Sequence, residues 1–196
     1  ASGSGQGNKV WINDGSGIFS DSGQSLGSSP SYDLDLGDLD GDGDLDLFVA
    51  NNTNNGSANK VWLNDGNGLF TDSGQSLGSS STEYVELADL DGDGDLDAFV
   101  ANRFNQANRV WMNDGSGTFS DSGQALGTRQ SNGVAIGDLD DDGDLDLVVG
   151  NRGEANTVWI NDGNGSFSDG GQLLGSGMTE AIAVADFDGD GDLDIF

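Results

Sequence analysis

The chain has 196 residues, 34% of them hydrophobic, and its 35 acidic and 6 basic residues give a formal net charge of −29. This charge excludes nucleic acids and anionic membrane surfaces as partners, because both are bound through clustered Lys and Arg, and it makes cations the natural ligands. The absence of cysteine excludes disulfides and thiolate metal sites, and no apolar run approaches the roughly 18 residues of a membrane-spanning helix.

The elements expected in chain order are all β-strands. A Val-Trp segment at 8–14 leads through Asn-Asp-Gly-x-Gly, a strong hairpin signal, into a short segment that carries Phe19. Apolar and polar residues then alternate over 33–37, and a nearly continuous apolar run at 47–50 follows a strongly acidic loop. Alternation predicts a half-buried strand and the apolar run predicts a strand buried on both faces.

These elements recur with a nearly constant period. The acidic loops occupy 38–46, 89–97, 138–146 and 186–194, so their starts are 51, 49 and 48 residues apart. The Val-Trp segments at 59–65, 108–114 and 156–162 keep the same period. We therefore predict that residues 1–196 form a single array of four repeats of about 49 residues.

Four antiparallel strands in each such repeat are typical of a β-propeller blade. The predicted fold is therefore an all-β propeller of four-stranded antiparallel blades. Trp and Phe of the third and fourth strands should fill the gaps between blades. The small residues Gly37, Ala88, Gly137 and Ala185 end the first strand, which suits an innermost strand where sheets crowd toward the axis.

The acidic loops suggest a metal site. Positions 1, 3, 5 and 9 of each nine-residue loop are Asp and position 6 is Gly, as in Asp38, Asp40, Asp42, Gly43 and Asp46. Alternate carboxylates of a tightly turned loop can converge, and they would repel one another without a cation between them. Several carboxylates from one flexible loop favour Ca²⁺ over Mg²⁺. An EF-hand is rejected, because its position-12 Glu is replaced by Val49, Val100 and Val149 inside strands.

This loop between two strands, followed by Asn-(Lys/Arg)-Val-Trp-x-Asn-Asp-Gly-x-Gly-x-Phe, resembles the FG-GAP/VCBS-type repeat of integrin-α-like β-propellers over the whole chain. The resemblance implies about four calcium sites, one per repeat, in which the Asp side chains at positions 1, 3, 5 and 9 and the backbone carbonyl at position 7 bind the ion. The implied residues are Asp38, Asp40, Asp42, Asp44 (carbonyl) and Asp46; Asp89, Asp91, Asp93, Asp95 (carbonyl) and Asp97; Asp138, Asp140, Asp142, Asp144 (carbonyl) and Asp146; and Asp186, Asp188, Asp190, Asp192 (carbonyl) and Asp194. Asp141, an extra acid at position 4 of the third loop, has no role in the pattern.

The repeat count raises the question of how a ring would close. Propellers of this family usually have about seven blades, and this chain supplies four repeats. The sequence starts with the third and fourth strands of one blade and finishes with the first and second strands of another. The two ends are therefore predicted to contribute the two halves of one shared blade. Two chains joined head to tail would give eight blades, an open contact would give a filament, and a longer parent chain would supply the missing blades itself.

The favoured function is a secreted, extracellular or cell-surface module for binding, adhesion or protein interaction, in which calcium has a structural role. Its ligand would be a protein or a glycan. The alternatives are a structural subunit of a fibre, surface layer or designed symmetric propeller, and a carbohydrate-binding lectin. Trp11, Trp62, Trp111 and Trp159 are expected between blades rather than as sugar platforms. An enzyme is not expected, because the chain has no His or Cys and its clustered carboxylates belong to the metal loops.

Overall fold

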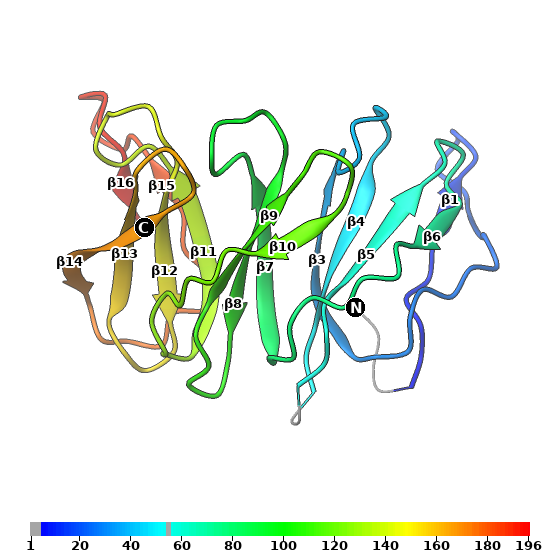
Figure 1. The fold of residues 1–196 in the computed structure, drawn as a ribbon, viewed down its shortest axis with the longest axis horizontal. Coiled ribbons are helices and arrows are strands. Elements are labelled where there is room, and N and C mark those ends of the chain that lie inside the picture. Colours follow the sequence, from blue (N-terminus) through cyan, green and yellow to red (C-terminus); the bar gives the residue numbers. More distant parts are fainter. Residues whose placement is uncertain (1–4, 54–55) are drawn as a thin grey trace.

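The computed structural model describes residues 5–53 and 56–196, and every regular element in those ranges is a β-strand. Three four-stranded antiparallel sheets form the body of the molecule, and a two-stranded hairpin lies at each end (Figure 1). No helix in the described ranges is long and apolar enough to cross a membrane. The all-β fold of blade-like sheets expected from the repeats is confirmed.

Each sheet is a meander in which sequence neighbours pair. The N-terminal hairpin contains β1 (Trp11–Asn13) and β2 (Phe19–Asp21). Blade 1 contains β3 (Ser31–Gly37), β4 (Asp46–Asn51), β5 (Lys60–Asn64) and β6 (Phe70–Asp72). Blade 2 contains β7 (Thr82–Ala88), β8 (Asp97–Asn102), β9 (Arg109–Asn113) and β10 (Phe119–Asp121). Blade 3 contains β11 (Ser131–Gly137), β12 (Asp146–Asn151), β13 (Asn156–Asn161) and β14 (Phe167–Leu174). The C-terminal hairpin contains β15 (Val184–Ala185) and β16 (Asp194–Ile195).

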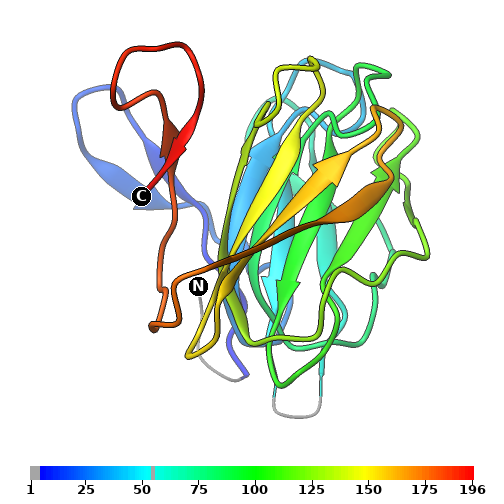
Figure 2. The same ribbon diagram turned by 90° about the vertical axis from the view of Figure 1, so that its left-hand side faces the viewer.

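The blades stack face to face, with their first strands adjacent. Strand β7 lies between β3 and β11, and the C-terminal hairpin follows with β15 beside β11. The acidic loops line one edge of the stack, at the top of Figure 1, and the connections between second and third strands line the opposite edge. A view along the stack shows both terminal hairpins on the same side of the three blades (Figure 2). The array is therefore curved rather than straight.

The hydrophobic core is divided among the interfaces between neighbouring blades, each of which we call a seam. Blades 1 and 2 enclose a cluster in which the rings of Phe48 and Phe119 meet edge to face, with centroids 5.4 Å apart. Trp111 belongs to this seam and is buried, whereas Trp11 in the N-terminal hairpin is 57% exposed. Tryptophan therefore packs between blades wherever a seam is complete.

Close packing explains the glycine that ends the first strand. A Cβ added to Gly37 would lie 2.5 Å from Cδ1 of Leu96 in the next blade, and one added to Gly137 would lie 2.7 Å from Cδ1 of Leu193. A Cβ at either position would displace the leucine side chain, and the equivalent position in blade 2 holds the small residue Ala88. The small residues expected on the innermost strand thus lie where neighbouring sheets crowd together.

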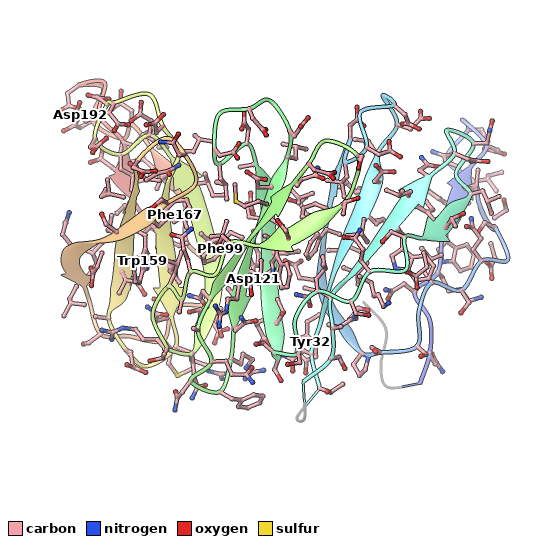
Figure 3. All side chains as sticks on the ribbon, viewed as in Figure 1. Tyr32, Phe99, Asp121, Trp159, Phe167 and Asp192 are labelled. Carbon is pink, nitrogen blue, oxygen red and sulfur yellow. The ribbon has the colours of Figure 1, made fainter. Side chains whose placement is uncertain are left out.

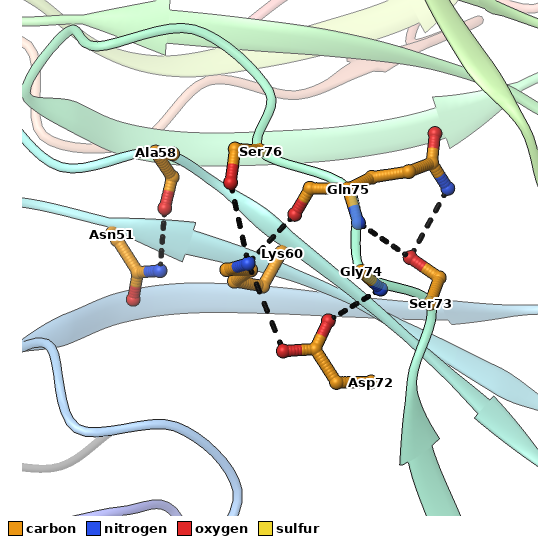
Figure 4. Close-up of polar contacts among 8 residues, drawn as sticks. All are labelled: Asn51, Ala58, Lys60, Asp72, Ser73, Gly74, Gln75 and Ser76. Carbon is orange, nitrogen blue, oxygen red and sulfur yellow. Dashed lines mark hydrogen bonds and ion pairs between the residues drawn. The ribbon is translucent and has the colours of Figure 1, made fainter.

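A glutamine that follows β2, β6 and β10 ties each of these strands to the next blade. Gln75 Nε2 donates to the Gly117 carbonyl at 2.6 Å, and its Oε1 accepts from the Phe119 N–H at 2.8 Å. The turn that carries this glutamine is held by Lys60, whose Nζ donates to the Gln75 carbonyl at 2.7 Å and lies 3.7 Å from a carboxylate oxygen of Asp72 (Figure 4). Gln24 and Gln124 make the same pair of bonds to blades 1 and 3.

Candidate metal centres

The carboxylate at position 1 organises each acidic loop. In the second loop, Asp89 accepts the N–H of Gly92 through Oδ1 at 2.8 Å and that of Gly94 through Oδ2 at 3.1 Å. Gly94 has a φ of 97°, a conformation that favours glycine and allows the chain to turn back over the carboxylate. The other three loops bind their first Asp through two backbone N–H groups in a similar way. The loop is therefore preorganised by its own backbone.

The carboxylate at position 9 joins the loop to the third strand. Asp97 is fully buried, and it accepts the Leu90 N–H through Oδ2 at 3.1 Å and the Asn113 N–H through Oδ1 at 2.8 Å. Asp46 and Asp146 are equally buried and make the equivalent bonds. The sequence pattern treated this residue only as a metal ligand, and its role as a cross-link between loop and strand was missed. The Asn-Asp that closes each Val-Trp segment is the repeated signal that could have indicated it.

Each repeat brings three carboxylates together, with one oxygen of each within 4.8 Å of the others. The groups are Asp38, Asp40 and Asp42; Asp89, Asp91 and Asp97; Asp138, Asp140 and Asp146; and Asp186, Asp188 and Asp194. Positions 1 and 3 therefore converge in every repeat, joined by position 5 in the first loop and by position 9 in the others. The remaining expected side-chain ligands, Asp46, Asp93, Asp142 and Asp190, lie in the same loops but outside these groups.

The carboxylate at position 7 faces the turn between the third and fourth strands. Asp44, Asp95 and Asp144 lie against Gly66, Gly115 and Gly163, where they leave no room for a Cβ. Asp192 is the counterpart in the C-terminal hairpin, at the upper corner of the molecule (Figure 3). The position-7 side chain thus has a packing role, which is compatible with the expectation that only its backbone carbonyl would bind an ion.

The electrostatics of the loops favour a cation. Burial, supported by the charges of Asp46 and Asp42, raises the pKa of Asp40. Burial also raises the pKa of Asp97 to about 6, even though hydrogen bonds from Asn113 and Leu90 act in the opposite direction. Carboxylates that resist ionisation because of burial and like charges are stabilised by a nearby cation. The donor set contains only oxygen, so the residues present fit a hard divalent ion.

The centres lie at the seams rather than on isolated blades. Asn113 of blade 2 donates through Nδ2 to the Leu39 carbonyl, inside the acidic loop of blade 1, at 2.9 Å. Asn161 of blade 3 makes the equivalent 2.8 Å bond to Leu90 in the loop of blade 2. Both asparagine side chains were missed as contributors by sequence reasoning, since nothing in one repeat shows which neighbouring loop it reaches. The loops of blades 1 and 2 are therefore each held by their own blade and by the next.

Comparison with known proteins agrees with this architecture. A family model described as FG-GAP-like repeat matches residues 1–49, 38–100, 89–149 and 138–196, which together cover the whole chain. The chain belongs to the FG-GAP-like repeat family. The resemblance drawn from the loop and Val-Trp motifs is thus confirmed. No curated protein matches the sequence of this FG-GAP-like repeat chain.

Solved structures match this chain, and one of them illustrates the shared fold. It is the crystal structure of a proposed exo-beta-1,3-galactanase from Bifidobacterium bifidum s17, and it superposes with a TM-score of 0.50 at 10% sequence identity. The alignment covers 91% of the FG-GAP-like repeat chain and 61% of that structure. At this identity the likeness supports the fold alone.

Proposed function

We propose that this FG-GAP-like repeat chain is a calcium-stabilised β-propeller module that works outside the cell as a binding or adhesion surface. The observation that carries the proposal is the convergence of three carboxylates in each of the four repeats, on loops whose backbone already holds them in place. Exposed acidic groups often cluster without a metal, but here the carboxylates at positions 1 and 3 converge in all four repeats, along one edge of a repeating fold.

The proposed ligands are the Asp side chains at positions 1, 3, 5 and 9 together with the position-7 carbonyl. In blade 2 these are Asp89, Asp91, Asp93, Asp97 and the carbonyl of Asp95. Such a set of oxygen donors suits the six to eight ligands and flexible geometry of Ca²⁺ better than the strict octahedron of Mg²⁺. The ion would neutralise repulsion within the loop, and no step of catalysis is assigned to it.

The proposed role of calcium is structural. In blade 2, Asp97 at position 9 links the loop to the third strand, and Asn161 of the following blade bonds to the same loop. An ion bound by the loop would therefore stabilise a strand and a seam together, and by mass action it would stabilise the fold. Sites of the extracellular class bind calcium with dissociation constants of roughly 10⁻⁴ to 10⁻³ M, so millimolar calcium outside cells would fill them.

Binding is proposed rather than catalysis. The chain has no His or Cys, and two glutamates outside the loops have partners: Glu83 pairs with Arg103 at 3.1 Å and Glu86 accepts from Tyr84 at 2.8 Å. The fold neighbour is named for action on a galactan, which makes a glycan a reasonable ligand class to include in binding assays. The blade-specific connections at 51–59, 102–108 and 151–156 differ most between repeats and are the proposed recognition surface.

Calorimetric titration and thermal melting test the calcium sites. We expect Ca²⁺ to bind with about four sites per chain, to raise the melting temperature, and to act at lower concentration than Mg²⁺. Asp89→Asn should remove one site. Asp121→Asn is the matched control, because Asp121 also accepts a glycine N–H, at 2.8 Å, but lies outside the carboxylate groups. An unchanged melting curve on chelation would refute the proposal.

A further inference from the structure

The basic residue that precedes Val-Trp in the third strand is replaced in blade 3. Lys60 of β5 and Arg109 of β9 hold this position in blades 1 and 2, whereas β13 has Thr157. Blades 2 and 3 are both complete four-stranded sheets, so the seam between them has the same layers as the seam between blades 1 and 2. The difference in blade 3 therefore comes from the residue itself.

The ammonium group of Lys60 shows what this position contributes to a blade. Its Nζ donates to the Gln75 carbonyl at 2.7 Å and lies 3.7 Å from a carboxylate oxygen of Asp72 (Figure 4). In blade 2, Arg109 makes the corresponding bond from Nη1 to the Gln124 carbonyl at 2.8 Å. Both side chains cross from the third strand to the turn after the fourth strand. Blades 1 and 2 thus supply a cation of their own at this place.

Thr157 supplies no cation to blade 3. Its hydroxyl oxygen accepts the indole N–H of Trp159 at 3.1 Å, and the residue is only 8% exposed. Asp169, the counterpart of Asp72, accepts the Gly171 N–H through Oδ1 at 2.8 Å but forms no ion pair with any residue that the structure describes. The carboxylate of Asp169 is therefore left without the cationic partner that Asp72 has.

A hollow of about 300 Å³ lies at this place, between blade 3 and the connection that leaves blade 2. Its lining includes Trp159, Asp169 and the ion pair of Arg129 with Glu154, in which nitrogen and oxygen are 3.1 Å apart. We call it the indole hollow. The corresponding hollow of blade 1 has a volume of about 190 Å³, and Lys60 is among its lining residues. The larger of these two hollows is thus the one without a basic residue on the third strand.

The indole hollow is complementary to a cation on an alkyl chain. Arg129, Glu154 and Asp169 carry one positive and two negative charges, and an indole ring attracts a cation placed over its face. Leu173, which is 64% exposed, offers apolar surface to an alkyl stem. We propose that the indole hollow binds a primary ammonium group at the end of an alkyl chain, the chemistry of a lysine side chain, in the place that Lys60 occupies in blade 1.

The surroundings of the indole hollow favour such a ligand. Glu154 belongs to the connection at 151–156, which is part of the proposed recognition surface. The formal net charge of −29 attracts cationic partners over a distance. The inference rests on the proposed binding function, because it names the chemistry of a partner, but none of the residues that carry it is a proposed calcium ligand.

Titration with n-butylammonium chloride, followed by calorimetry and indole fluorescence, is the first test. We expect one site per chain, and we expect added salt to weaken binding because the Asp169 carboxylate is exposed and its charge is screened. N-butylacetamide has the same alkyl chain without the charge and should not bind. A failure of n-butylammonium to saturate the protein, or equal binding of the neutral amide, would overturn the proposal.

Nα-acetyl-lysine methylamide identifies the source of the ammonium group. Tighter binding of this compound than of n-butylammonium would assign the indole hollow to a lysine of a protein, and equal affinity would assign it to a free alkylamine. Both results support an ammonium site. Calcium titration of the same samples separates this inference from the proposed calcium sites, because a chain that binds calcium without binding either amine would refute the ammonium site alone.

A lysine placed on β13 tests where the ligand binds. Thr157→Lys should abolish binding of n-butylammonium, because the new side chain would fill the indole hollow from within the chain. Ser168→Lys is the charge-matched control, since Ser168 is exposed on β14 and lies outside the lining. It should leave the affinity unchanged. Loss of binding in both variants would show that net charge and not the hollow determines binding, and would contradict the proposal.

Replacement of the unpaired carboxylate tests its role. Asp169→Asn keeps an Oδ1 acceptor for the Gly171 N–H. It should raise the dissociation constant of n-butylammonium about three- to fivefold, the effect of losing one partly exposed ion pair. Asp121→Asn is the matched control, because Asp121 accepts the Gly123 N–H at 2.8 Å in blade 2 but does not line the indole hollow. Equal affinities of the two variants would contradict the assignment of Asp169 as the anionic partner.

Discussion

Blade 2 and the terminal hairpins have nearly the same sequence motifs but very different surroundings. Blade 2 lies between two neighbours, and Phe99, Val110 and Asp97 in it are essentially inaccessible to solvent. The hairpins have a neighbour on one side only, and Trp11 and Phe196 remain exposed. The comparison teaches that a repeat of this family acquires its stability from its seams, as expected for arrays in which each unit contacts only adjacent units.

The largest contrast is expected for phenylalanine in the fourth strand. Phe119→Ala should lower the free energy of unfolding by about 3–5 kcal/mol, because it empties a buried position against Phe48. Phe19→Ala should change it by no more than about 0.5 kcal/mol in the monomer, since the ring is mostly in solvent. Urea unfolding in dilute calcium-containing buffer measures both values. Similar losses of unfolding free energy for the two variants would contradict this prediction, because they would show that the N-terminal hairpin is as well packed as blade 2.

The next largest difference in stability is expected between variants of Asp97 and Asp194, the position-9 aspartates of the second and fourth loops. With calcium chelated, Asp97→Ala leaves two buried N–H groups without an acceptor and should cost about 2–3 kcal/mol or more. Under the same conditions, Asp194→Ala removes one exposed hydrogen bond and should cost about 1 kcal/mol or less. Thermal melting of the two variants at low protein concentration checks the difference. A larger loss for Asp194→Ala would contradict the role given to the third-strand N–H.

The effect of pH on the melting temperature should have opposite signs with and without calcium. The pKa of Asp97 is raised to about 6 in the folded metal-free protein, against an ordinary value of 3.8. The unfolded chain therefore ionises more easily, and stability is lost as pH rises from the ordinary value through about 6. Acidification from pH 7 to 5 should raise the melting temperature in chelator and lower it in calcium, because protons then compete with the ion. A melting temperature that falls on acidification both in chelator and in calcium would contradict this prediction.

The smallest effect is expected at Asp141. This residue has a φ of 60°, in the region where the other three loops have glycine, and the charges of Asp190 and then of Asp141 raise the pKa of Asp192 in the next loop. Asp141→Gly should stabilise the chain by up to about 1 kcal/mol, because it relieves backbone strain. Asp140→Gly is the contrasting change, since it removes a member of a carboxylate group and should weaken calcium binding. Differential scanning calorimetry can resolve the predicted rise in melting temperature.

The sequence by itself determined the repeat, its strands and the composition of its loops. Alternation before each acidic loop and an apolar run after it are local patterns, and strands β3 and β4 occupy these segments, although Leu34 and Leu36 of β3 are exposed. The Asn-Asp-Gly-x-Gly turns and the loop glycines depend on backbone conformations that few other residues adopt. Such features repeat because their physical cause lies within a few residues of the chain.

Only the tertiary structure decided which identical motifs are buried and which remain open. Leu34 and Val85 hold the same place in the same pattern, yet one faces solvent and the other faces Phe48, because burial depends on the blade that lies alongside. The cross-link made by Asp97 and the reach of Asn113 into the loop of the preceding blade likewise join segments far apart in sequence. Periodicity specifies the faces of each sheet, and the stacking of sheets determines what covers them.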